Sequence, residues 1–189
     1  MDRVVIGARG DLRFRAARIL THGDTCEPLH GADFCVQVTL QGDLGTTGRM
    51  IDFHTVTLVV HRFCMSVHRR ILLPLDNPTL TVRQDGEAWH ATHGMRHWTF
   101  PTCDVAVFRV VNLTNEMLAR LCLAEVRGAL QDDVEAGVLR DIEVAVSDPE
   151  GTASYDEAWA VPSGHAGARG INAAVEQASS RSWVRPATT

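Results

Sequence analysis

The stretch that decides the fold runs from His30 to Gln41 and reads "HGADFCVQVTLQ". From Phe34 onward, apolar and polar side chains alternate, which is the period-two pattern of a strand with one buried face. The apolar set is Phe34, Val36, Val38 and Leu40, and the residues between them are Cys35, Gln37, Thr39 and Gln41. His30 and Ala32 have the parity of the apolar set, so we expect both side chains on the buried face of this strand.

Outward from this strand the sequence predicts an α+β order of elements. Residues 3–8 and 11–20 read as extended segments divided by a turn. Helices are predicted after Asp52 and after Thr114, since each is an N-cap residue followed by apolar residues at helical spacing. Between the helices, short strands surround an Asp85-Gly86 hairpin turn, and two further strands follow the second helix. This order is typical of an antiparallel sheet with packed helices.

The composition predicts one soluble domain with a C-terminal tail. We expect the domain to span residues 1–161, and residues 162–189 to form a flexible Gly/Ala/Ser-rich tail with one short helix around 171–179. The net charge of −5 argues against a nucleic-acid partner. The N-terminus has no apolar run of signal-peptide or membrane length, and the five cysteines form no C-x-x-C pair. These features predict a cytoplasmic protein with reduced thiols and no membrane partner.

Two clusters of basic residues allow a chemical and a purely structural interpretation. The run "WHATHGMRHW" (Trp89–Trp98) contains His90, His93 and His97, but it lies beside a hairpin turn and is interpreted as solvated loop histidines. The run "VHRR" (Val67–Arg70) places positive charge at a helix C-terminus, which the helix dipole favours on its own. Neither cluster assigns a function by itself.

Six separated stretches, taken together, resemble one known family. They are "FRAAR" (Phe14–Arg18), similar to F-x-A-A-H; "CEPLHGA" (Cys26–Ala32), similar to C-x-x-L-H-G-H; "GRMIDF" (Gly48–Phe53), similar to G-x-x-x-D-F; "VHRRILLP" (Val67–Pro74), similar to L-D-H-R-x-L-L-P; "NLTNE" (Asn112–Glu116), similar to a T-x-E helix start; and "SDPEGTASY" (Ser147–Tyr155), similar to E-T-P followed by a tyrosine. The family is that of the 6-pyruvoyltetrahydropterin and 6-carboxytetrahydropterin synthases, and the stretches occur in its order over residues 4–160.

The resemblance implies the tunnelling fold. Such a subunit has an antiparallel four-stranded sheet, two helices packed on one face and here an inserted β-hairpin. Subunits of this kind assemble into an oligomeric barrel with active sites at their interfaces. We therefore expect a homo-oligomer that binds a small-molecule substrate. The family's chemistry uses three zinc-bound histidines, a cysteine, an Asp-His pair and a glutamate that anchors the guanidine-like edge of the pterin.

Carried over residue by residue, the family's metal site is incomplete in this sequence. Its first and third zinc histidines fall on Arg18 and Ala32, and only the second remains, as His30. A permanent guanidinium charge opposes a bound cation, and His22 as a substitute would still leave too few ligands. We therefore expect no zinc and no other cofactor.

The remaining functional positions are partly retained. Cys26 falls on the catalytic cysteine, the Asp-His pair falls on His68 and Arg69, and the pterin-anchoring glutamate falls on Ser147. Thr114 and Glu116 remain in the helix start, and Asp148 lies one residue from the anchor position. The candidate catalytic residues are thus Cys26, His30, His68 and Arg69, and the candidate substrate-binding residues are Arg18, Thr114, Glu116, Ser147 and Asp148.

Three functional hypotheses follow from this set. The first is a metal-independent enzyme of lyase, isomerase or cyclase type, whose cationic pocket binds a small anionic or heterocyclic substrate in a specialised biosynthetic pathway. The second is a non-catalytic oligomeric binding or partner protein. The third is an ordinary zinc-dependent synthase of the same family.

Overall fold

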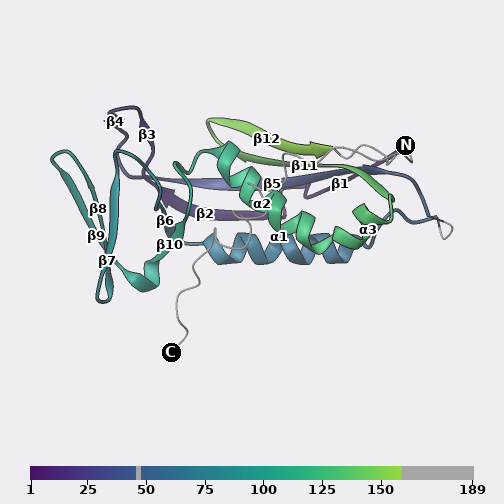
Figure 1. The fold of residues 1–189 in the computed structure, drawn as a ribbon, viewed down its shortest axis with the longest axis horizontal. Helices are drawn as coiled ribbons and strands as arrows, with labels where there is room; N and C mark the ends of the chain where they lie inside the picture. The colour runs from purple at the N-terminus through teal and green to yellow at the C-terminus, as the bar shows by residue number, and fades with distance from the viewer. Residues whose placement is uncertain (46–47, 159–189) are drawn as a thin grey trace, which may run out of the picture.

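The strand that begins at His30 is the centre of the main sheet in the computed structural model, which describes residues 1–45 and 48–158 (Figure 1). Seven strands form this sheet in the order β10-β6-β2-β5-β11-β12, with β1 also paired to β5. Their bounds are β1 Asp2–Ile6, β2 Arg13–Arg18, β5 His30–Gly42, β6 Arg70–Pro74, β10 Val105–Phe108, β11 Leu139–Asp148 and β12 Gly151–Ala158. Strands β2 and β1 share one edge of β5, because β2 pairs with its first half and β1 with its second.

Two long helices, α1 (Phe53–Val67) and α2 (Asn115–Ala129), cover one face of this sheet. Each begins at the predicted N-cap: the Asp52 carboxylate accepts a hydrogen bond from the His54 N–H, and the Thr114 hydroxyl accepts one from the Met117 N–H. These bonds satisfy backbone donors that the first helical turn leaves free. The prediction of two helices on one face is confirmed, and a short helix α3 (Gln131–Glu135) follows α2.

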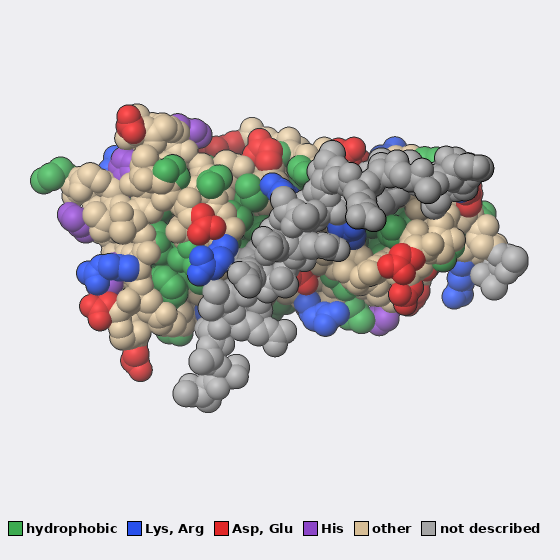
Figure 2. All heavy atoms as spheres, viewed as in Figure 1, with side chains coloured by type: hydrophobic (Ala, Val, Ile, Leu, Met, Phe, Trp, Pro, Cys, Tyr) green, Lys and Arg blue, Asp and Glu red, His purple; other side chains and the backbone are tan. Residues whose placement is uncertain are grey.

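Two small sheets extend the molecule at one end (Figure 1). The first pairs β3 (Thr21–His22) with β4 (Thr25–Cys26), and the second is formed by β7 (Thr81–Asp85), β8 (Ala88–His93) and β9 (Arg96–Pro101). A 3-10 turn over Thr102–Asp104 leads from β9 into β10. These small sheets carry the histidines that gather at this end of the surface (Figure 2).

The main sheet differs from the predicted four-stranded antiparallel one. It has seven strands, and β6 runs parallel to both β2 and β10. Helix α1 carries the chain back along the sheet before β6, and such a crossover is what a parallel pair requires. Side-chain alternation reports which face a residue occupies but not the direction of its neighbour, so the parallel pairs were not predictable from it.

Three other expectations concern the hairpin, the C-terminal tail and a membrane-spanning helix. The expected hairpin is a three-stranded sheet, so His90 and His93 lie on β8 and His97 on β9 rather than in a loop. The expected tail over 162–189, with its helix around 171–179, lies outside the described residues. Within the described part of the chain, no helix is long and apolar enough to cross a membrane.

Aromatic rings fix the core beneath the functional positions. Phe14 of β2 and Phe34 of β5 are fully buried and stacked, with ring centroids 4.7 Å apart. Phe63 of α1 meets the Phe14 ring edge-on at 6.3 Å. Since Phe14 and Phe34 are also partners across the strand pair, these contacts set the register of β2 against β5 and the seating of α1 on the sheet.

Replacing Phe14 with Ala should therefore destabilise the whole fold. Loss of a buried phenyl ring costs about 3–5 kcal/mol of unfolding free energy, measurable by urea unfolding. The matched control is Met95→Ala. Because Met95 is 94% exposed, its replacement should leave the unfolding free energy almost unchanged. A Phe14→Ala variant as stable as the control would contradict this account of the core.

Candidate functional site

The first family metal position is occupied by a buried ion pair. Arg18, the last residue of β2, is 4% exposed and donates from Nη2 to Asp148 Oδ2 at 2.8 Å. Its Nη1 donates to the Leu113 carbonyl at 3.0 Å and to Asn115 Oδ1 at 2.8 Å. The guanidinium also lies over the Phe34 ring, 4.9 Å from its centroid. Arg18 is therefore held by β11, α2 and β5 at once.

Asp148 is built to accept this charge. Its side chain is 2% exposed, and its Oδ1 accepts hydrogen bonds from the backbone N–H groups of Glu150 and Gly151 at 2.9 and 3.0 Å. Burial alone would raise the pKa of the Asp148 carboxyl. The two backbone donors, then the Asn115 amide and the Arg18 charge, outweigh burial and hold this pKa below its ordinary value.

Strand alternation explains why Asp148 fills this role and Ser147 does not. Along β11 the buried residues are Ile142, Val144 and Val146, and Asp148 continues their parity toward the helices. Ser147 has the opposite parity and is half-buried on the other face. The carboxylate one residue off the family's anchor position is thus the one that faces Arg18.

Thr114 and Glu116 lie beside this pair at the start of α2. The Thr114 hydroxyl caps the helix, and its hydrogen bond to Glu116 lowers the pKa of that exposed carboxyl. The backbone N–H of Glu116 and the nearby Arg18 charge lower it further. Four of the five predicted substrate-binding residues therefore meet at the ends of β2 and β11 and the start of α2, whereas Ser147 is turned to the opposite face.

The donor set at the three implied metal positions does not fit a zinc ion. Arg18 is a cation with its own counter-ion, Ala32 has no donor atom, and His30 offers one imidazole. Zinc in proteins takes three or four nitrogen, sulfur or oxygen ligands. Across residues 1–45 and 48–158, no three His, Cys, Asp or Glu side chains are grouped so that they could hold a metal.

A second cluster of polar side chains surrounds the β3–β4 hairpin, and Glu27 contacts both of its histidines. Glu27 Oε1 lies 2.7 Å from His22 Nε2, and its Oε2 lies 3.6 Å from His30 Nδ1. Arg96 of β9 donates to the Cys26 carbonyl at 2.8 Å. Glu27 and Arg96 were missed from the sequence. For Glu27 a local signal existed, because it lies three residues before His30. For Arg96 there was none, because nothing near it in the sequence connects it to Cys26.

The cysteine of this cluster is a thiol rather than a thiolate at neutral pH. Burial raises the pKa of Cys26 above its ordinary value, and the Arg96 charge opposes this effect without reversing it. The sulfur lies 3.4 Å from the Glu27 carbonyl, which an S–H group can use as an acceptor. Cys26 is therefore better suited to donate a proton than to attack a substrate.

The two candidate histidines are held in opposite tautomers. His30 Nδ1 lies 3.1 Å from the Pro28 carbonyl, which can only accept, so in the neutral imidazole Nδ1 carries the proton and Nε2 carries the lone pair. His68 Nδ1 instead accepts from the Arg15 backbone N–H at 3.2 Å, so its proton is on Nε2. In their neutral forms, His30 can accept a proton at Nε2 and His68 can donate one.

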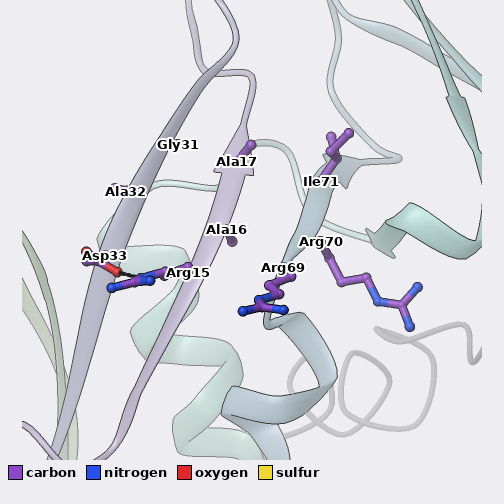
Figure 3. A pocket seen from close by; sticks show the side chains of 9 residues that line it. All are labelled: Arg15, Ala16, Ala17, Gly31, Ala32, Asp33, Arg69, Arg70 and Ile71. Carbon is purple, nitrogen blue, oxygen red and sulfur yellow. Dashed lines mark hydrogen bonds and ion pairs between the residues drawn. The ribbon is translucent and has the colours of Figure 1, made fainter.

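His68 and Arg69 do not meet Arg18. They follow α1 and lie against Arg15, where the Arg69 N–H donates to the Arg15 carbonyl at 2.6 Å. Arg69 lines a cavity with Arg15 and Ala17, whose parity along β2 is opposite to that of the buried residues (Figure 3). The expected cationic pocket is therefore not formed within one subunit. Arg18 is neutralised by Asp148 in the core, whereas His68 and Arg69 lie against Arg15 in a separate region.

A mixed sheet with two helices on one face, carrying these six stretches along its strand and helix ends, defines a tetrahydropterin-synthase-like subunit. Residues 9–158 match the family model of 6-pyruvoyl tetrahydropterin synthase. The chain belongs to the 6-pyruvoyl tetrahydropterin synthase family.

Individual relatives are similar to this chain in sequence or in fold. The curated relative named "Putative 6-carboxy-5,6,7,8-tetrahydropterin synthase", from Methanocaldococcus jannaschii, is 23% identical over 127 residues, which are 67% of this chain and 78% of that protein. The 6-pyruvoyl tetrahydropterin synthase of Plasmodium vivax superposes with a TM-score of 0.78 at 19% identity, covering 84% of this chain and 98% of that one. An uncharacterised protein of Wolinella succinogenes gives a TM-score of 0.53 at 17% identity, covering 82% and 97%.

Breaking the buried pair should destabilise the protein in a pH-dependent way. At neutral pH, Asp148→Asn leaves the Arg18 charge uncompensated, and loss of one partner of a buried pair costs about 3–5 kcal/mol of unfolding free energy. The folded pKa of Asp148 lies below the unfolded value of about 3.9, so its contribution is complete above that value and is lost as pH falls through the folded pKa. The gap between wild type and variant should therefore be constant near neutral pH and shrink as pH falls from about 5 to about 3.

Urea unfolding across this pH range measures the gap. Asp85→Asn is the matched control, because Asp85 and its partner Arg83 are 70% and 63% exposed. That control should cost less than about 1 kcal/mol at any pH. A gap for Asp148→Asn that stays constant down to pH 3 would show that the carboxylate charge is not what stabilises the fold.

Proposed function

We propose that this chain is a metal-independent member of its family that performs acid–base chemistry of lyase, isomerase or cyclase type on a small substrate. The observation that carries the proposal is the buried Arg18–Asp148 pair. It places a permanent cation where the resemblance implies the first zinc ligand. A fixed guanidinium at that point disfavours a divalent cation, so the reaction must proceed through proton transfers by the chain's own groups.

The same pair argues against the family's usual substrate. The resemblance implies that a carboxylate near position 147 grips the guanidine-like edge of a pterin. Here Asp148 already holds a guanidinium, that of Arg18, with charge-assisted hydrogen bonds. A pterin would have to displace an internal partner whose two terminal guanidinium nitrogens are both hydrogen-bonded, so we expect a different heterocyclic or anionic substrate.

The acid–base groups we assign lie around the β3–β4 hairpin. His30 is the base through Nε2, since the Pro28 carbonyl and the Glu27 carboxylate both face its Nδ1. Cys26 is the acid, since burial keeps its thiol protonated.

A homo-oligomer with sites at subunit interfaces completes the proposal. His30 is paired with Arg18 at the end of β2, and His68 is hydrogen-bonded to the backbone of Arg15 near the middle of that strand. In their neutral forms the two histidines have complementary tautomers. An interface would bring His68 of one protomer, as the proton donor, to the His30 of another. We expect this assembly in the cytoplasm, as the sequence predicts.

A second candidate function is a non-catalytic binding or partner protein. It is favoured by the same neutralisation of Arg18, which removes from the central pocket the charge that would have oriented a substrate. In that case Cys26 and His30 pack and hydrogen-bond without exchanging protons. The measurement is ligand binding by wild type as a function of pH. If no histidine contributes to its pH dependence, the binding protein is favoured over the enzyme.

Metal analysis tests the central claim. We expect purified wild type to hold far less than one zinc per protomer and to keep its melting temperature in EDTA. The double variant Arg18→His with Ala32→His supplies two imidazoles beside His30 and should gain a zinc-dependent rise in melting temperature. Stoichiometric zinc in wild type, released by His30→Ala, would establish the ordinary zinc-dependent synthase instead.

Binding of 6-carboxy-5,6,7,8-tetrahydropterin tests the substrate claim. Calorimetry should detect no binding to wild type, because Asp148 is already paired with Arg18. Arg18→Ala frees the Asp148 carboxylate and should allow weak binding, whereas Arg83→Ala, at an exposed pair, should not. Tight binding to wild type that survives in Arg18→Ala would overturn the proposal that the pair excludes a pterin.

A further inference from the structure

We infer that the sheet face opposite the helices carries a binding site for a small-molecule oxyanion, a phosphate or a carboxylate, held by Arg15 and Arg69. Within one subunit this site is separate from the acid–base cluster around His30, although His68, the proton donor of the proposed reaction, directly precedes Arg69. Anion binding by the two arginines requires no step of that reaction. Its residues come from β2, from β5 and from the junction of α1 with β6 (Figure 3).

The site is a hollow with a volume of about 480 Å³ on the open side of the sheet. Its floor is made by Ala17 and Gly31, which face each other in the β2–β5 register. Because neither residue has a side chain beyond Cβ, the sheet is recessed at this point. The volume falls in the range of metabolite-binding cavities, about 300–1,000 Å³.

Charge on the rim of this hollow favours an anion. Arg15 hydrogen-bonds Asp33 through Nε, which leaves the two terminal nitrogens of its guanidinium without a partner among the described residues. Arg69 is exposed, and its guanidinium has no hydrogen bond or ion pair to any residue in 1–45 or 48–158. Figure 3 shows Arg69 beside Arg15, with Arg70 extending away from them on the other side of β6.

The backbone holds Arg69 in this position at an energetic cost. Its φ of +57° makes it the only non-glycine residue in the described ranges with a left-handed conformation. A bulky side chain in that region is strained. Both hydrogen bonds between Arg15 and residues 68–69 pin this turn against β2. A strained arginine whose charge has no internal partner is expected where a ligand supplies the partner.

The chemistry of the two side chains defines the ligand class. A guanidinium donates two parallel hydrogen bonds to the paired oxygens of a carboxylate or phosphate, and its charge strengthens them. The short apolar floor of Ala17, with Ile71 beside it, accepts the uncharged remainder of a metabolite. The ligand is therefore a small organic molecule with one oxyanion group.

The test measures thermal shifts and calorimetry with inorganic phosphate, glycerol phosphate and succinate, against sodium chloride of equal ionic strength. We expect wild type to bind one anion per protomer and to be stabilised by it beyond the chloride control. Tighter binding of glycerol phosphate than of succinate would identify the natural ligand as a phosphate ester. Tighter binding of succinate would identify it as a carboxylate. Stabilisation equal to that by chloride would overturn the site.

Arg69→Gly is the decisive variant, because glycine adopts a positive φ freely. It should melt at a higher temperature than wild type without ligand and should bind the anion at least tenfold more weakly. Gly31→Val should also block binding while keeping both arginines, since a Cβ at Gly31 would lie 3.6 Å from the Ala16 carbonyl oxygen, an ordinary contact. Arg83→Gln, in the separate β7–β9 sheet, is the charge-matched control and should bind as wild type.

His30→Ala separates this site from the proposed reaction. Anion binding should be unchanged in that variant. Evidence against the acid–base proposal would therefore not count against the anion site, and evidence against the anion site would not count against the acid–base proposal. If Arg69→Gly binds the anion as wild type does, the assignment is wrong. If instead it alters only the subunit stoichiometry measured by light scattering, the face is an interface between copies and the anion site is excluded.

Discussion

The Arg18–Asp148 ion pair is the interaction on which the functional half of the structure depends. Both side chains are almost fully buried, and removing two charges from water costs several kcal/mol per ion unless hydrogen bonds replace the lost hydration. The structure supplies them from three elements: the Leu113 carbonyl and Asn115 before and within α2, and two backbone N–H groups after β11. The pair therefore ties together the ends of β2 and β11 and the start of α2, where the sequence resemblance places the substrate-binding residues.

This constraint determines where chemistry remains available. A guanidinium fixed by Asp148 and lying over Phe34 is neither a metal ligand nor a free anion receptor. Groups that can exchange protons are found instead at the rim, where His30 is 30% exposed and Glu27 faces its Nδ1. In the function proposed above, the family scaffold is retained and the reactive groups lie at its edge, because the ion pair restores the shape and charge balance of the core.

The sequence predicted what depends on neighbours along the chain and missed what depends on distant partners. Asp52 and Thr114 identified both helix starts because capping is a local hydrogen bond. Arg18 was identified as a departure from the metal pattern, but its counter-ion lies 130 residues away, so its burial could not be foreseen. The parallel pairing of β6 with β2 and the contact of Arg96 with Cys26 were not predicted either, because the partners are far apart in the sequence.

Alternation along β2 explains how one short strand serves two regions. In "RFRAAR", Arg15 and Ala17 face the open side, whereas Phe14, Ala16 and Arg18 face the helices. Its neighbour β5 divides in the same way, with Gly31 and Asp33 opposite His30 and Phe34. A one-residue slip between β2 and β5 would remove both the ion pair and the basic hollow. The aromatic stack of Phe14 on Phe34 therefore secures function as well as stability, because it fixes the register on which both regions rely.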